Sequence, residues 1–197
     1  KRLGDTGHDL GRAPKRGACI EGRQKVVALG LLSEKYHWGS SDLIGKGSYG
    51  KLYLARCAES KRKVALKRIR QCPEQPWQRE FELMRRMRHP NIVQLIETYI
   101  PNSDFGALIM VAADTDLHNL LSKRGGVVSL RLTRDLTADM LKGLRYLHEN
   151  LVAHRDLKPS NILLSVADNG VLQAWLADFG LARFVPSVDT GGDNAAT

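Results

Sequence analysis

The chain has 197 residues, of which 43% are hydrophobic and 26% charged, and its formal net charge is +9. This composition argues against disorder throughout and suffices for a sizeable core, in one domain or in two small lobes. Three cysteines, Cys19, Cys57 and Cys72, are too few and too widely spaced for a disulfide framework or a four-ligand zinc site. They indicate a reducing, intracellular setting.

The sequence contains no signal for a membrane or for nucleic acid. No apolar run approaches the roughly 18 residues that span a bilayer, and the N-terminus lacks the apolar stretch of a secretory signal. Residues 1–37 hold eight Lys or Arg against four Asp or Glu, but they lack interleaved aromatics and any nucleic-acid-binding motif. We therefore expect a soluble monomer in the cytoplasm, the nucleus or both, which binds neither membrane nor nucleic acid.

In chain order, residues 1–37 are expected to form a basic, mostly mobile extension with one short apolar cluster between residues 26 and 32. A first lobe is expected over residues 38–113. It begins with a strand, a glycine-rich turn and a second strand up to residue 55. A polar turn then leads to residues 64–69, where alternation predicts another strand.

The next segments contain both helix and strand signals. Prolines open and close the stretch 77–87, which predicts a helix that has Glu80 on one face with Met84 and Met87. Strands are expected over 92–100 and 107–111. A long helix over residues 129–149 follows from an apolar stripe at helical spacing, formed by Leu132, Leu136, Met140, Leu144 and Leu147.

The loop Gly45-Lys46-Gly47-Ser48-Tyr49-Gly50 has the pattern G-x-G-x-x-G, in which missing side chains let backbone N–H groups approach phosphate oxygens. Alone this pattern is weak. A dinucleotide site needs a helix to open at the last glycine, but a strand is expected there. A glycine-rich hairpin without a ligand remains an alternative at this point.

Lys67 ends the apolar run Val64-Ala65-Leu66 on the far arm of the same hairpin, where its ammonium group is within reach of phosphates under the loop. Glu80 on the next helix is placed to hold it by charge pairing. The alternative is an ordinary exposed ion pair, which contributes little to stability.

Two further motifs favour a phosphate-binding catalytic site over the two alternatives above. His154-Arg155-Asp156-Leu157-Lys158-Pro159-Ser160-Asn161 brings a carboxylate, a cation and an amide within six positions, and Asp178-Phe179-Gly180 adds a second carboxylate. Phosphoryl transfer to a hydroxyl needs such groups, because a carboxylate must orient the hydroxyl while a cation and Mg²⁺ steady the phosphate charge. Magnesium prefers a few oxygen ligands completed by phosphates and water, so one Asp and one Asn suffice.

These motifs, in this order over residues 40–183, resemble the protein kinase catalytic domain. The resemblance implies an α+β fold with a small antiparallel β lobe that has one helix, a hinge near residues 111–114, and an incomplete, mainly helical C-terminal lobe over residues 114–197. It implies ATP and Mg²⁺ as cofactors and a protein as substrate.

The catalytic residues that the resemblance implies are Asp156 as base, Lys158 on the γ-phosphate, and Lys67 with its partner Glu80. Asn161 and Asp178 would hold the metal. The nucleotide-binding residues it implies are Ile44, Gly45, Gly47, Gly50, Leu52, Ala65, Lys67, Met110, Val111, Ala113 and Leu163.

The resemblance also suggests a substrate class and a subgroup. Lys158, two positions after Asp156, is typical of serine/threonine kinases. Residues 114–120 are similar to the segment after the hinge in mitogen-activated protein kinases, although cyclin-dependent kinases share much of this sequence. Arg155 beside Asp156 suggests an upstream activating kinase, because an Arg there can pair with a phosphate on the activation segment.

The chain departs from the family in two places. The connection between Asn161 and Asp178 is about two residues longer than usual, which predicts a longer hairpin. The chain stops inside the activation segment, at Thr197, so we expect the apolar stripe of the long helix to be left partly wet and the chain alone to be poorly stable and nearly inactive. A non-catalytic nucleotide-binding or scaffold fragment is the rival interpretation.

Overall fold

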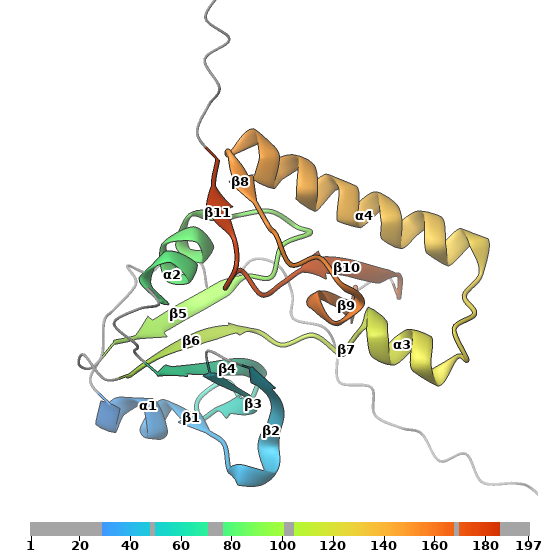
Figure 1. Cartoon of the computed structure of the whole chain (residues 1–197). Coiled ribbons are helices and arrows are strands. Elements are labelled where there is room, and N and C mark those ends of the chain that lie inside the picture. Colours follow the sequence, from blue (N-terminus) through green and yellow to red (C-terminus); the bar gives the residue numbers. More distant parts are fainter. Residues whose placement is uncertain (1–28, 48–49, 71–76, 101–104, 168–169, 186–197) are drawn as a thin grey trace, which may run out of the picture.

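The computed structural model describes residues 29–47, 50–70, 77–100, 105–167 and 170–185. Figure 1 shows an antiparallel sheet with short helices at one end of the molecule, and a long helix with small sheets at the other. This α+β arrangement is that of the predicted two-lobed protein kinase fold.

The N-terminal lobe is built on a six-stranded antiparallel sheet of order β1-β3-β4-β6-β5, with β2 also paired to β3. Its strands are β1 (Tyr36–His37), β2 (Leu43–Gly47), β3 (Gly50–Cys57), β4 (Lys63–Arg70), β5 (Leu95–Tyr99) and β6 (Phe105–Val111). A short 3-10 turn, η1 (Ser40–Asp42), separates β1 from β2. The predicted strands at 43–55, 64–69 and 107–111 are confirmed, while the strand expected over 92–100 is shorter.

Strand alternation gives this sheet two apolar faces, because successive side chains point to opposite sides. On one face Leu66 and Ile109, which are cross-strand partners, join a core with Leu32 and Tyr36. On the other face Ile69 and residues such as Leu108 and Met110 pack toward α2 (Trp77–Arg86) and the second lobe. Lys67 is on this second face, so it points toward the space between the lobes.

The segment expected to be a mobile extension folds over its last residues. Residues 29–37 form α1 (Leu29–Lys35) and β1, and the side chains of Leu32 and Tyr36 are buried in the sheet's outer core. Lys35 also makes an ion pair of 2.5 Å with Glu97 on β5. The boundary of the folded domain therefore lies before residue 38 because an apolar cluster finds partners on the sheet. Residues 1–28 of the predicted extension lie outside the described part.

Helix α2 confirms the predicted face. Glu80 and Met84 are buried on it, and Met87, directly after its last residue, is buried on the same side, as their spacing of four and three residues predicts. The helix ends near Arg86, before the turn at His89-Pro90.

The second lobe combines two helices with small sheets. They are α3 (Leu117–Lys123), α4 (Leu130–Glu149), the sheet β10-β9-β7 and the pair β8–β11. The strands are β7 (Thr115–Asp116), β8 (Val152–Ala153), β9 (Ile162–Val166), β10 (Leu172–Leu176) and β11 (Arg183–Phe184). The longer connection before Asp178 is the β9–β10 hairpin, closed by a hydrogen bond of 2.8 Å from the N–H of Ala167 to the carbonyl oxygen of Val171.

Helix α4 starts where the sequence predicts. Ser129 is its N-cap and accepts a hydrogen bond from the N–H of Leu132 at 3.2 Å. The expectation that its apolar stripe is left partly wet holds for three of the five residues. Leu132, Met140 and Leu144 are only partly buried, whereas Leu136 is 3% exposed and Leu147 0% exposed, because β10 and β8 pack against the helix.

Among the described residues, no helix combines the length and apolarity that crossing a bilayer would require.

Candidate active site

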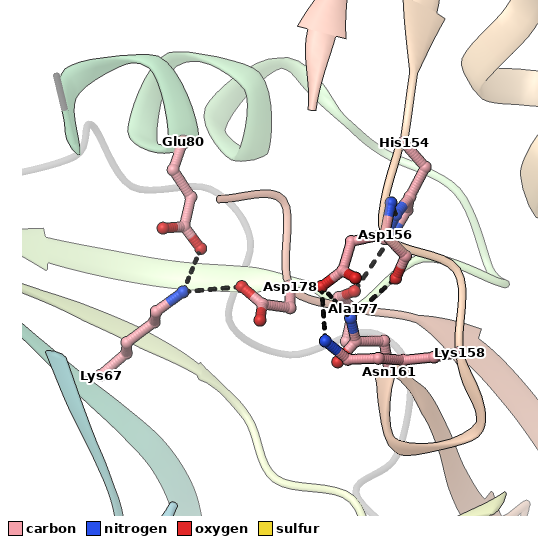
Figure 2. A network of polar contacts seen from close by, with 8 residues as sticks. All are labelled: Lys67, Glu80, His154, Asp156, Lys158, Asn161, Ala177 and Asp178. Atoms are coloured by element: carbon pink, nitrogen blue, oxygen red, sulfur yellow. Dashed lines mark hydrogen bonds and ion pairs between the residues drawn. The ribbon is translucent and has the colours of Figure 1, made fainter. Parts of the chain in front are cut away.

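Lys67 on β4 lies between two carboxylates that come from different parts of the chain. Its Nζ atom is 2.7 Å from Oε1 of Glu80 on α2 and 2.9 Å from Oδ1 of Asp178. Figure 2 shows this bridge, with Lys67 and Glu80 on one side and Asp178 reaching in from the second lobe. The lysine thus ties the helix of the first lobe to the metal-binding carboxylate predicted in the second.

Burial and charge oppose each other in this cluster. Burial disfavours the charged form of Lys67, but the carboxylates of Glu80 and Asp178 outweigh it and raise the pKa of this lysine. Burial acts against ionised Asp178 too, yet Lys67 lowers the pKa of Asp178 below its ordinary value. At neutral pH the bridge is therefore an ammonium group facing an ionised aspartate, which suits the binding of phosphates and a cation side by side.

Asp156 is held by two donors that follow it in the chain. Nζ of Lys158 lies 2.7 Å from Oδ2 of Asp156, and Nδ2 of Asn161 donates to the same oxygen at 2.9 Å and to the Asp156 carbonyl at 2.8 Å. The turn η2 (Pro159–Asn161) brings the amide back, since the backbone N–H of Asn161 donates to the Lys158 carbonyl at 2.9 Å. Among the described residues Oδ1 of Asp156 has no donor, so this atom is left to receive a proton.

His154 connects Asp156 to the strand that precedes Asp178. Its Nε2–H donates to the carbonyl of Ala177 at 3.0 Å, while its Nδ1 accepts the N–H of Asp156 at 3.3 Å. We assign this tautomer because a carbonyl oxygen only accepts. The ring is 3% exposed and lies 5.0 Å from that of Phe179. Burial lowers the pKa of His154, so the ring is neutral and can make both bonds.

Two residues of the site have left-handed backbones. Arg155 has φ 68° and Asp178 has φ 61°, values that residues other than glycine adopt at a cost and that cluster at functional sites. The turn at Arg155 orients the next residue, Asp156, and the turn at Asp178 orients its own carboxylate.

The oxygens of Asp178 and Asn161 fit a magnesium ion. The nitrogen of the Asn161 amide is used twice on Asp156, so its oxygen is the atom left for a metal. Lys67 engages one of the two carboxylate oxygens of Asp178. Within the described part of the chain no three metal-ligating side chains gather, which is compatible with Mg²⁺, because this ion takes its remaining ligands from phosphates and water.

The protein kinase domain family matches residues 38–195, which is most of the chain and includes every residue of the candidate site from Lys67 to Phe179. The chain belongs to the protein kinase family. It is 35% identical over 170 residues to cell division control protein 2 homolog 3 of Trypanosoma brucei brucei, covering 84% of this chain and 52% of that protein.

Two other relatives support the same placement. Cyclin-dependent kinase 10 of Homo sapiens is 40% identical over 146 residues, which are 71% of this chain and 39% of that protein. Serine/threonine-protein kinase crk1 of Schizosaccharomyces pombe is 32% identical over 156 residues, 77% of this chain and 45% of that protein. This kinase chain thus spans about half, or less, of the length of these relatives.

Most of the apolar residues predicted to enclose the adenine ring are brought together. Leu52, Ala65 and Leu163 all pack at the border of one core, and Ala65 is the cross-strand partner of the buried Met110. Ile44, by contrast, is 56% exposed at the edge of β2.

The predicted hinge is anchored on both sides. The N–H of Val111 donates to the Gln94 carbonyl at 3.0 Å and that of Asp114 to the Leu164 carbonyl at 3.0 Å. The N–H of Val111 is therefore engaged within the protein, and Ala113 lies between the two anchored residues. Which backbone groups of the hinge contact a nucleotide stays a prediction. Asp114 adds a second anchor, since its carboxylate accepts from Ser165 Oγ at 3.0 Å and from the N–H of Val166 at 2.9 Å.

The three glycines of the loop differ in how much space there is for a side chain. A Cβ at Gly50 would lie 2.1 Å from the carbonyl oxygen of Arg68, so β3 and β4 approach too closely for any other residue. A Cβ at Gly45 would only touch Leu52 at 3.5 Å. Gly47 pairs with Gly50 across the turn, and residues 48–49 lie outside the described part. Gly50 therefore has a packing role that the sequence motif does not reveal.

His154 is the functional residue that sequence reasoning names only as part of a motif. Its position two residues before Asp156 is visible in the sequence, but its bond to Ala177 joins residues 23 positions apart and has no local signal.

Proposed function

We propose that this chain contains the nucleotide-binding and catalytic residues of a kinase that transfers the γ-phosphate of ATP to serine or threonine in proteins. The observation that supports this most is the bridge of Lys67 to both Glu80 and Asp178, beside an Asp156 whose second oxygen is open (Figure 2). Those are the positions that the transfer of a phosphoryl group to an alcohol requires.

Each side chain has a role in the proposed reaction. The hydroxyl oxygen of the substrate attacks the γ-phosphorus, a new O–P bond forms, and the bond from that phosphorus to ADP breaks. Asp156 Oδ1 receives the hydroxyl proton, and Lys158 lies close enough to the same carboxylate to offset charge on the transferred group. Lys67 orients the nonreacting phosphates. Asn161 and Asp178 would hold Mg²⁺, which when bound supplies neutralisation of phosphate charge.

For the subgroup we favour a cyclin-dependent-like kinase over a mitogen-activated one. Residues 114–120 resemble both groups, but two of the three relatives named above are called a cell division control protein and a cyclin-dependent kinase. A cyclin-type activating protein is therefore a proposed partner. An upstream kinase is a second proposed activator, because Arg155 is exposed beside Asp156 and can pair with a phosphate.

The rival interpretation, a scaffold without catalysis, is not supported by the site. Lys67, Asp156 and Asp178 are all kept, and each has the contacts that catalysis needs.

Because the sequence predicts that the chain alone is nearly inactive, the test is designed to detect slow transfer. Transfer of labelled γ-phosphate from ATP and Mg²⁺ to a mixture of proteins is followed at high concentration of the chain, and the labelled amino acids are identified. We expect label on serine and threonine, and a loss of at least about 10²-fold when Asp156→Asn removes the base. Asp135→Asn is the matched control and should keep full transfer, because this half-exposed side chain on α4 pairs only with neighbouring arginines of the same helix. Equal transfer by Asp156→Asn and the control would contradict the assignment.

A further inference from the structure

A cavity of about 360 Å³ opens on the N-terminal sheet outside the active site, where β1 and η1 meet β3 and β4. In Figure 1 β1 and β3 lie on the side of the sheet away from α4. The residues that matter in its lining are His37, Trp38, Asp42, Leu54, Arg56 and Lys63. The volume is at the lower end of the range for small-molecule sites, and nothing in the proposed phosphoryl transfer uses these residues.

The cavity gathers basic side chains from three neighbouring strands. His37 is the cross-strand partner of Arg56, and Arg56 is the partner of Lys63. Partners directly opposite each other in an antiparallel pair point to the same face of the sheet, and like charges there destabilise the pairing. Within the described part of the chain neither Arg56 nor Lys63 has a carboxylate within 4.0 Å. A pair of opposed cations without counter-charge is what an anion would stabilise.

We propose that this cavity binds a phosphate monoester, with the phosphate between Arg56 and Lys63. A phosphate monoester carries close to two negative charges at neutral pH, which matches two cations better than a carboxylate does. The guanidinium of Arg56 is already oriented, since its Nη1 donates to the Lys61 carbonyl at 2.9 Å and its other nitrogens remain for a forked contact. Trp38 and Leu54 supply apolar surface for the organic part of the ester.

Asp42 is the acidic residue in this lining, and it gives the proposal a sharp test. Its Oδ2 accepts the N–H of Gly39 at 2.7 Å, so the carboxylate is held in place by the turn. A bound phosphate would be repelled by it. Removing this charge should therefore strengthen binding, whereas removing Arg56 or Lys63 should weaken it.

The cavity shares a sheet face with the nucleotide site, so the two must be separated in the experiment. Lys63 and Lys67 are four residues apart on β4 and point to the same face, roughly 13 Å apart along the strand. Lys67→Met removes the lysine proposed to bind phosphate in the kinase site and changes no residue of the cavity lining. This variant is titrated only under conditions in which circular dichroism shows it folded, because it is expected to be less stable. This variant also makes failure of the cavity proposal distinguishable from failure of the proposed kinase function.

The experiment titrates phenyl phosphate into the full chain and follows binding by isothermal calorimetry. We expect saturable binding that weakens at least about tenfold in Arg56→Gln/Lys63→Gln, tightens severalfold in Asp42→Asn, and is unchanged in Lys67→Met. The matched control is Lys61→Asn/Arg62→Gln, which removes two cations from the adjoining turn. Asn suits the left-handed backbone of Lys61, whose φ is 58°. Circular dichroism of each variant checks that the fold is kept.

Three results would overturn the proposal: no saturable binding, an equal loss in the control pair, or a loss confined to Lys67→Met. A parallel titration with a peptide that contains one phosphoserine separates the two sources of the ester. Tighter binding of the peptide than of phenyl phosphate assigns the cavity to a phosphorylated protein segment, and the reverse order assigns it to a small phosphate ester.

Discussion

The ammonium group of Lys67 pairs with one carboxylate from each lobe. It neutralises Glu80, whose side chain is 5% exposed, and it positions Asp178 from the other lobe. Burial raises the pKa of Glu80 even though the lysine opposes that shift. Removing the lysine would leave this carboxylate buried without a counter-ion, and that penalty is larger than the net contribution of an intact buried pair.

We therefore expect Lys67→Met to lower the free energy of unfolding by about 3–5 kcal/mol. Adding Glu80→Leu should recover most of that loss, because the uncompensated charge is gone, while phosphoryl transfer stays absent. Urea unfolding of the two variants and the wild type measures this. A double variant as unstable as Lys67→Met alone would show that charge burial is not the cause.

His154 makes a prediction about pH. Its pKa is lowered in the folded chain, so the folded state binds fewer protons than the unfolded state around and below the ordinary value of 6.5. Stability should therefore fall as the pH drops through that value, and the decline should end below the lowered pKa of the folded state.

The variant His154→Phe keeps an aromatic ring against Phe179 but cannot titrate. We expect the wild type to lose more stability than this variant between about pH 7.5 and about pH 5.5, a window around the ordinary histidine pKa, as measured by urea unfolding. His89→Gln is run beside it, because burial lowers the pKa of His89 as well. An unchanged pH dependence in His154→Phe would contradict the neutral, doubly bonded histidine.

At the scale of elements, long periodic segments are predictable and short ones are not. The helices α2 and α4 have apolar spacing and proline or serine boundaries, so their faces and ends follow from local chemistry. Strands of two residues, such as β7 and β8, are too short to show a period. They form only by pairing with strands from distant segments, β7 with β9 and β8 with β11.

The α1–β1 unit shows how tertiary contacts overrule a local interpretation. A basic, glycine-rich segment with one apolar cluster suggests mobility, yet Leu32 and Tyr36 are buried on the outer face of the sheet. The apolar cluster is the available signal. The sequence alone does not show that the outer face of the sheet is apolar and that this cluster packs against it.

Leu32→Ala tests whether this unit belongs to the folded domain. Because Leu32 is fully buried, its truncation should cost about 2–5 kcal/mol of unfolding free energy. Leu141→Ala on α4, where the side chain is 60% exposed, is the matched control and should stay within about 0.5 kcal/mol of the wild type. Thermal and urea unfolding compare the two. A similar small effect for both would mean that α1 contributes little to the domain.

For the whole molecule, the site depends on segments far apart in sequence that meet between two lobes. The sequence motifs identify Lys67, Glu80, Asp156, Asn161 and Asp178 as members of one site. They cannot reveal which oxygen of Asp156 lacks a hydrogen-bond donor. Nor can they reveal that the N–H of Val111 donates to the Gln94 carbonyl or that His154 donates to the Ala177 carbonyl. Those facts depend on the relative placement of the lobes, which no local pattern encodes.

Asn91 contributes to this placement. It is buried between the lobes, its Nδ2 donates to the Ala174 carbonyl at 3.0 Å, and its own carbonyl accepts the N–H of Leu176 at 2.9 Å. Gly143 of α4 allows this approach, since a Cβ there would lie 2.8 Å from the Asn91 carbonyl oxygen. The two lobes are thus joined at the hinge, at Asn91 and through Lys67.

The central claim is that Asp178 and Lys67 face one bound nucleotide together with a magnesium ion. The most direct measurement is the affinity of the chain for ATP with and without Mg²⁺, in the wild type, in Asp178→Ala and in the half-exposed control Asp135→Ala on α4. We predict that Mg²⁺ tightens ATP binding in the wild type and the control but not in Asp178→Ala. An equal effect of Mg²⁺ in all three proteins would contradict the claim.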